Sequence, residues 1–262
     1  MIGTIVGFAG IALAVAMFRG DPGRPRRWLG VIALALISLQ GLIGGLRVLV
    51  VSDPAVQNTV LDYTGGGIDV ELRRAVKAMI HGVTAQVIFA ALCCIAVMTS
   101  RRWLSDWAAP RTRAATVSRW MAGGTLALGV IQLGLGTYVR QIGQGVMWHI
   151  TGALLVSVAI IATALRIMRH HPHSPLRRTA WATCLLLCLQ VFLGLTPYLM
   201  TGGDMYVSEL ASMVGLMRSL HVVCGATILA LLSVQALWLF RLTGTPEGMQ
   251  ASKAQDFEAN FA

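Results

Sequence analysis

Residues 146–168 read VMWHITGALLVSVAIIATALRIM, an apolar run with one histidine near its start and one arginine near its end. An α-helix rises about 1.5 Å per residue, so about 20 apolar residues cross the ~30 Å hydrocarbon core of a bilayer. Six further runs of this kind cover residues 2–18, 28–51, 77–99, 118–140, 179–200 and 214–240. The sequence therefore predicts an all-α fold, a polytopic membrane bundle of about seven transmembrane helices.

The composition supports a membrane protein. Of the 262 residues, 56% are hydrophobic and 12% are charged, and the mean hydropathy is +0.69. A soluble domain carries roughly 25% charged residues. The net charge of +10 is concentrated in short loops, without a basic stripe and interleaved aromatic residues. We therefore expect membrane lipid as a partner and no nucleic acid.

The distribution of lysine and arginine predicts the orientation. Fifteen of the 21 fall on one side of the predicted membrane and six on the other. The positive-inside rule then places the N-terminus outside and the C-terminus in the cytoplasm, in a bacterial-type cytoplasmic (inner) membrane. The sequence also predicts a tight outer turn over residues 141–145 and a mobile cytoplasmic tail over residues 242–262.

The first apolar run has two interpretations. Ala14-Val15-Ala16 resembles a signal-peptide cleavage site. However, the basic residues follow the run instead of preceding it, which favours a retained anchor with its N-terminus outside.

The chain contains a motif pair that occurs three times. A helix with glutamine and glycine four residues apart is followed by a helix that opens with histidine, and a small residue lies four positions after each histidine. The three sets are Gln40, Gly44, His81 and Ala85; Gln132, Gly136, His149 and Ala153; and Gln190, Gly194, His221 and Gly225. Repetition gives weight to a pattern that would be weak in one copy.

The three histidines are candidate ligands of heme iron. His81 and His149 lie about four residues inside their predicted helices, which both enter from the outer side, so we expect similar depths. Neutral imidazole is a natural axial ligand, and helix bundles hold such cofactors between facing helices. Ala85 and Ala153 would leave flat space beside each ring. The alternative is that each histidine only forms hydrogen bonds within the bundle.

Other polar residues of the repeat have candidate roles. Arg47, Arg140 and Arg218 lie near the outer helix ends, where they would pair with anionic propionates or extend toward the interface. Gln40 and Gln132 lie deeper, and would contact the cofactor or form hydrogen bonds between helices that approach closely at the glycines.

The remaining reactive residues receive simpler interpretations. His170, His171 and His173 are expected in a solvated basic loop. The five cysteines lie inside apolar runs, where we expect small buried side chains and neither a metal site nor an external disulfide.

The repeat resembles the heme A synthase family. The match is carried by Leu39-Gln40-Gly41-Leu42-Ile43-Gly44-Gly45-Leu46-Arg47 and by Gln132-Leu133-Gly134-Leu135-Gly136-Thr137-Tyr138-Val139-Arg140, and it covers most of the chain after the first run. The resemblance implies oxidation of heme O toward heme A for cytochrome oxidase assembly. It also implies an eight-helix protein of two four-helix halves, each with a histidine pair, and a retained heme b in one half.

Carried over to this sequence, the resemblance implies one bundle over residues 1–241. Residues 28–168 would form a heme-binding half in which His81 and His149 are the axial pair. Residues 1–18 and 179–240 would form an incomplete second half, in which His221 matches the first histidine. Heme b, heme O and heme A are the implied cofactors, substrate or product, and heme O synthase or cytochrome oxidase assembly factors are implied partners. A homo-oligomer would complete the second half.

The sequence departs from the family at several positions. Many members carry a glutamate three residues before the first histidine, where this chain has Met79. Glu71 is the one glutamate of that external loop and is the candidate catalytic residue. These differences leave three functions open: a heme A synthase-like oxidoreductase; a bis-histidine b-type heme protein that transfers electrons with quinone or another redox partner; and a membrane subunit or transporter without a cofactor.

Overall fold

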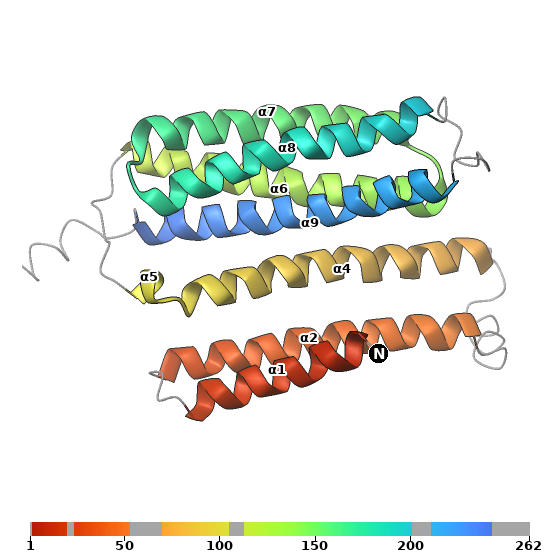
Figure 1. Ribbon diagram of the computed structural model, residues 1–262, viewed down its shortest axis with the longest axis horizontal. Helices are drawn as coiled ribbons and strands as arrows, with labels where there is room; N and C mark the ends of the chain where they lie inside the picture. The colour runs from red at the N-terminus through yellow and green to blue at the C-terminus, as the bar shows by residue number, and fades with distance from the viewer. Residues whose placement is uncertain (1, 20–23, 53–69, 105–112, 201–210, 243–262) are drawn as a thin grey trace, which may run out of the picture. The chain divides into compact units, whose positions relative to one another are not determined.

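The computed structural model describes residues 2–19, 24–52, 70–104, 113–200 and 211–242, and all regular structure in these ranges is α-helical. The helices are shown in Figure 1. They are α1 (Ile2–Arg19), α2 (Arg24–Ser52), α4 (Val70–Met98), α5 (Arg101–Leu104), α6 (Arg113–Ile142), α7 (Val146–His170), α8 (Ser174–Met200) and α9 (Ala211–Leu242).

Six of these helices are long and apolar enough to cross a membrane: α2, α4, α6, α7, α8 and α9. Helix α1 adds a shorter apolar stretch, Gly7–Arg19. Large apolar side chains point outward from the spans, as the exposed fractions of Trp120 (79%), Trp148 (73%) and Leu185 (73%) illustrate. Surfaces of this kind face acyl chains. The chain is an all-α integral membrane protein.

A mobile tail was predicted over residues 242–262. Of this range, only Leu242 is among the described residues.

Several helices begin earlier than predicted. Helix α4 begins at Val70 where the apolar run begins at residue 77, and α6 begins at Arg113 where the run begins at residue 118. Arginine favours helix, and its long side chain reaches the interface from a helix end. His149 is accordingly the fourth residue of α7, as expected, but His81 is the twelfth of α4. The expectation that His81 lies about four residues inside its helix is wrong.

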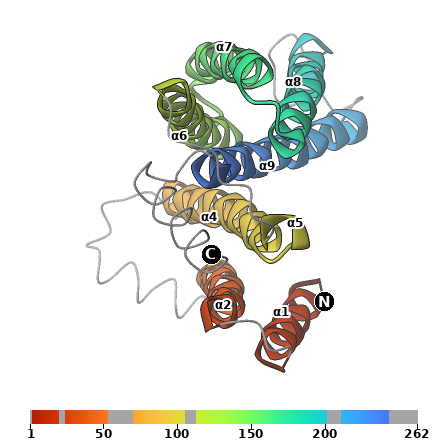
Figure 2. The ribbon, with the colours of Figure 1, turned by 90° about the vertical axis from the view of Figure 1, so that its left-hand side faces the viewer.

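The chain divides into two compact units, which are described separately. Unit 1 comprises residues 1–99 and 133–149. In it, α1 packs against α2 and α2 against α4 (Figure 2). Small residues allow the first contact: a Cβ at Gly10 would lie 2.8 Å from Ile37 Cδ1, and one at Gly30 would lie 3.1 Å from Met17 Sδ. The division into a heme-binding half and an incomplete half stays a prediction.

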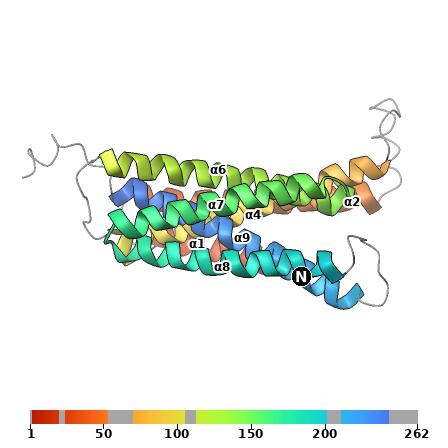
Figure 3. The ribbon, with the colours of Figure 1, turned by 90° about the horizontal axis from the view of Figure 1, so that it is seen from above.

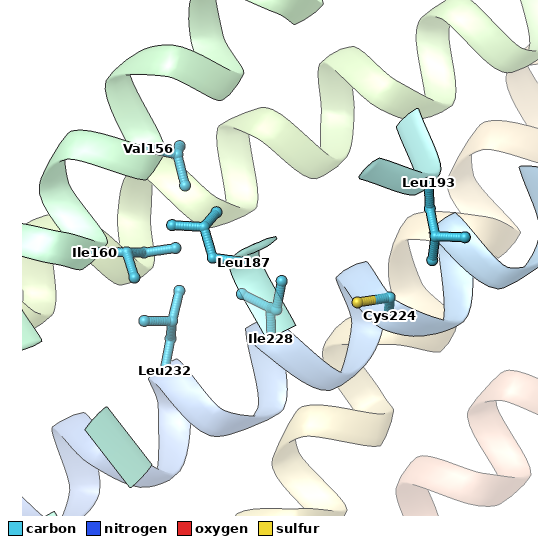
Figure 4. Close-up of a cluster of buried hydrophobic side chains, with 7 residues drawn as sticks. All are labelled: Val156, Ile160, Leu187, Leu193, Cys224, Ile228 and Leu232. Atoms are coloured by element: carbon cyan, nitrogen blue, oxygen red, sulfur yellow. The ribbon is translucent and has the colours of Figure 1, made fainter. Parts of the chain in front are cut away.

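Unit 2 comprises residues 100–132 and 150–262, and its core forms where α7, α8 and α9 meet. Helix α8 packs along α9, and α7 and α8 meet at the connection of residues 171–173 (Figure 3). Side chains converge from all three helices in Figure 4, and Leu193 lies by Cys224. Packing contacts of this kind drive helix association where lipid is as apolar as the core. The cluster comprises Val156, Ile160, Leu187, Leu193, Cys224, Ile228 and Leu232.

A glycine turn joins α6 to α7. Gly143 and Gly145 have φ values of 77° and 80°, in the left-handed region that glycine adopts without steric cost. The His149 backbone N–H donates to the Gly145 carbonyl at 3.1 Å, which starts α7. The predicted tight turn is confirmed over residues 143–145, while residues 141 and 142 are the last residues of α6.

Three polar side chains form a hydrogen-bonded cluster in unit 2, where α6 begins and α7 ends. Arg166 Nε donates to Ser118 Oγ at 3.0 Å, and the same oxygen lies 2.9 Å from His171 Nε2. Ser118 is 1% exposed and His171 6%. The expected solvated loop is therefore wrong for His171, although His170 is exposed. Burial first, and then the charges of His173, His170 and Arg166, lower the pKa of His171.

Candidate functional site

The first histidine of the repeat packs directly on the glycine of its own motif pair. A Cβ added to Gly44 would lie 3.1 Å from His81 Cε1 and 3.7 Å from Nδ1. Any side chain at residue 44 would therefore press on the imidazole. The glycine brings α2 and α4 together at the ring.

Gln40 holds the same ring from α2. Its Nε2 lies 3.0 Å from His81 Nδ1 and donates to the His81 carbonyl at 3.2 Å. Thr84, one turn further along α4, donates to Gln40 Oε1 at 3.0 Å, and its oxygen also lies 2.7 Å from the Ile80 carbonyl. His81 Nε2 makes no hydrogen bond within the described ranges. One nitrogen of the ring is held and the other is open.

The second histidine repeats the glycine contact within unit 1. A Cβ at Gly136 would lie 3.1 Å from His149 Cε1 and 3.5 Å from Nδ1. These values match the first pair closely. Unit 1 thus contains two imidazoles, His81 and His149, each seated on a glycine four residues after a glutamine.

The third pair lies in unit 2 and is tighter. A Cβ at Gly194 would lie 2.8 Å from His221 Cε1. Gln190 contacts both ring nitrogens: its Nε2 lies 3.0 Å from His221 Nε2, and its backbone carbonyl lies 3.1 Å from Nδ1. The predicted interhelical hydrogen bonds of the repeat are therefore confirmed for Gln40 and for Gln190.

The sequence predicted free space beside each histidine ring, at the small residue four positions later. This space differs between the third and the first motif pair. A Cβ at Gly225 would lie 3.2 Å from Gln190 Nε2, so the room beside His221 is filled by an amide. At the corresponding position beside His81 the chain has Ala85, which is half-buried.

The other predicted site residues are placed as follows. Arg140 is exposed in the last turn of α6, Arg218 is half-buried one turn before His221, and Gln132 is half-buried on α6. Glu71 is the second residue of α4, and Arg47 lies near the end of α2. The side chains of Glu71 and Arg47 lie outside the described residues, so their predicted roles stay predictions.

Sequence reasoning missed Thr84 and the contact of each histidine with its glycine. Nothing in the sequence marks Thr84 except that it lies three residues after His81, on the same helix face. The spacing of glutamine and glycine suggested close helix contact, but it did not indicate that the contact would be the imidazole itself.

The cysteines were expected to be small buried side chains, and this is confirmed only for Cys224. All five are free, but Cys93, Cys94 and Cys184 are half-buried, and the expectation is wrong for Cys188, which is exposed. Cys224 Sγ donates to the Leu186 carbonyl at 3.4 Å, which is helix packing. Among the described residues, no group of three or more histidine, cysteine, aspartate or glutamate side chains is arranged to hold a metal ion. A heme site would need only two imidazoles as axial ligands.

Comparisons of this chain with protein families, with curated proteins and with solved structures found no match. Its function is therefore inferred from the geometry of the repeat and from the resemblance described above.

Proposed function

We propose that this protein binds heme in its membrane domain, with His81 and His149 as axial ligands, and acts as a heme A synthase-like oxidoreductase. The proposal rests on one observation: in unit 1, each of the two imidazole rings packs against the glycine of its own motif pair. A Cβ at Gly44 or at Gly136 would lie 3.1 Å from the Cε1 of its histidine. Histidines inside a bilayer are rare and are usually functional.

His81 fits a metal-ligating role because of how Gln40 is held. As oriented, the Gln40 amide donates to Nδ1, so the ring proton is on Nε2. Ligation through Nε2 requires the proton on Nδ1 and an acceptor for it. A Gln40 amide turned over supplies that acceptor through Oε1, and Thr84 can accept from the amide nitrogen because its hydroxyl both donates and accepts. Gln40 and Thr84 can thus support either tautomer, and the turned-over amide gives up its bond to the His81 carbonyl.

The remaining residues have supporting roles in this proposal. Arg140, in the last turn of α6 and in the same unit as both histidines, would pair with a propionate near the outer helix end, and the apolar spans would exclude water from the pocket. The role predicted for Arg218, which lies in the other unit, stays a prediction. Heme supplies the redox chemistry when bound, since the protein groups themselves are weak oxidants. The proposed activity is oxidation of heme O toward heme A. Its location is a bacterial-type cytoplasmic membrane with the N-terminus outside.

A second candidate is electron transfer by a b-type heme, with quinone as the partner class. Met79 favours it, because many heme A synthases have a glutamate at this position. Met79 is half-buried on α4 and has no acid–base chemistry. In this case the chain would bind heme b without modifying it.

The test is to purify the protein in mild detergent after expression with heme O available. Oxidised and reduced spectra should show a low-spin heme that is lost in His81→Ala and in His149→Ala. His170→Ala, an exposed histidine outside the repeat, is the matched control and should keep the spectrum. Absence of heme in the wild-type protein would reject both functions.

Extraction of the pigment distinguishes the two functions. Heme A or a hydroxylated precursor supports the synthase. Heme b alone, with heme O shown to be present in the cells, rejects the synthase and leaves the electron carrier.

A further inference from the structure

The third copy of the repeat differs from the first in how its histidine is held. Both ring nitrogens of His221 contact Gln190, one through the amide at 3.0 Å and the other through the backbone carbonyl at 3.1 Å. In the first copy, Gln40 contacts only one of the two ring nitrogens of His81, Nδ1, and its amide also donates to the His81 backbone carbonyl. The same residue type therefore holds one ring at one nitrogen and the other ring at both.

The contacts of His221 fix its tautomer. A carbonyl oxygen only accepts, so His221 Nδ1 must carry the proton that it donates to Gln190. Nε2 then has the lone pair, and this lone pair accepts a hydrogen bond from the Gln190 amide. Nε2 is also the nitrogen through which a histidine in this tautomer would ligate a metal. The lone pair is therefore already in use.

Gly225 makes this arrangement possible. A Cβ at residue 225 would lie 3.2 Å from Gln190 Nε2 and 3.8 Å from its Cδ, closer than the amide could easily tolerate. In the first copy this position is Ala85. There the amide is held instead by Thr84, whose counterpart in the third copy, Cys224, donates away from the ring to Leu186.

We infer that Gln190 is a positioning residue that makes His221, the histidine of the third copy, unavailable as a ligand. The Gln190 amide occupies the Nε2 lone pair, through which His221 would otherwise ligate heme or a metal ion, and the Gln190 carbonyl fixes the tautomer. Gly225 provides the space that the amide needs. Heme is then confined to the copies in unit 1. This last statement rests on the proposed function, whereas the closure of His221 does not.

The closure is tested on the heme-free protein with diethyl pyrocarbonate, which acylates imidazole nitrogens that have an accessible lone pair. Peptide mass spectrometry gives the rate for each histidine. In Gln190→Leu, the rate at His221 should rise about tenfold over the wild-type rate, because the hydrogen bond from the Gln190 amide to the Nε2 lone pair no longer has to open. The bond from Nδ1 to the Gln190 carbonyl does not block Nε2, so it does not enter this comparison.

Two further variants make the result specific. Gly225→Ala keeps the glutamine but places a Cβ against its amide, and should also raise the His221 rate. Gln86→Leu removes a half-buried glutamine from α4, and should leave the His221 rate unchanged. The inference is overturned if neither Gln190→Leu nor Gly225→Ala raises the rate of acylation at His221.

Heme content provides the second measurement. The wild-type protein should bind no heme whose spectrum depends on His221, and His221→Phe should keep the low-spin spectrum. A heme signal that is lost in His221→Phe but not in His81→Ala would overturn the inference. If no heme binds at all, the proposed function fails, while the acylation rates still decide whether Gln190 closes the site.

Discussion

Two hairpins of this protein carry the same motif and use it differently. In the α2–α4 pair, Gln40 bridges His81 and Thr84 and leaves one imidazole nitrogen open. In the α8–α9 pair, Gln190 engages both nitrogens of His221, and the glycine contact is tighter, 2.8 Å instead of 3.1 Å to Cε1. Histidines at matching positions of the repeat therefore differ in which ring nitrogens are hydrogen-bonded. Residues three and four positions after each histidine decide which of its atoms remain available.

The largest expected effect on stability comes from replacing the glycines that contact the histidine rings with a larger residue. Gly194→Val should destabilise unit 2 by about 2–3 kcal/mol, because overpacking a close contact moves side chains and backbone. Gly44→Val should cost less, since the contact with His81 is longer. The measurement is the free energy of unfolding in mixed micelles titrated with a denaturing detergent.

Alanine variants refine the same comparison. A Cβ added to Gly41 would meet no atom within 4 Å, so Gly41→Ala is the control and should be neutral or stabilising by up to about 1 kcal/mol through helix propensity. Gly44→Ala should be less stable than this control, and Gly194→Ala less stable again. Equal effects at residues 44 and 194 would remove the stated difference between the hairpins.

A change of pH should affect unit 2 in particular, because His171 is buried there. Its pKa is lowered on folding, chiefly by burial. The unfolded chain therefore binds the proton more tightly, and the free energy of unfolding should fall as the pH drops below about 6.5, by at most about 1.4 kcal/mol per pH unit. Above that pH this histidine contributes no pH dependence.

The measurement is hydrogen exchange of α6 and α7 backbone amides at about pH 7.5 and about pH 5.5, corrected for intrinsic exchange rates. His171→Gln should reduce the pH dependence around residue 118, and His170→Gln, at an exposed position, should not. Equal acid sensitivity in α2 and in α7 would contradict a cause located at His171.

The smallest expected effect is that of Thr84→Val. This change removes the hydroxyl that holds the Gln40 amide, and interhelical hydrogen bonds in membranes contribute about 0.6 kcal/mol on average. Thr227→Val is the control, because the Thr227 hydroxyl bonds to the Val223 carbonyl of its own helix. The free energies of unfolding of the two variants should differ by about that amount. The 15N resonances of His81 in histidine-labelled protein should shift in Thr84→Val and should not shift in Thr227→Val.

Much of the fold could be predicted from the sequence. Apolar runs located the spans, because in a bilayer the backbone must satisfy its own hydrogen bonds and helices are the simple solution. Helix ends were less predictable: Arg73 and Arg74 continue α4 outside the apolar run, so the position of His81 in its helix was misjudged. The motif spacing also indicated which helices would meet.

The details of the site could not be predicted, because they depend on packing between distant segments. Ser118 lies 53 residues from His171 in the chain, and no local pattern connects the two. Similarly, Gly225 looked equivalent to Ala85 as a small residue after a histidine. Only the structure reveals that Gly225 leaves room for the Gln190 amide beside His221, while Thr84 holds the Gln40 amide beside His81.

The glycine turn at residues 143–145 has a consequence for the order in which contacts form. Gly136 and His149 are 13 residues apart, against 27 for Gly194 and His221 and 37 for Gly44 and His81. Loop-closure entropy grows with the logarithm of length, so closing the longest of these contacts costs about 0.9 kcal/mol more than closing the shortest. When the full-length chain refolds from a denaturing detergent, the α6–α7 contact should therefore form first. During synthesis the order is different, because α2 and α4 leave the ribosome before α6 and α7.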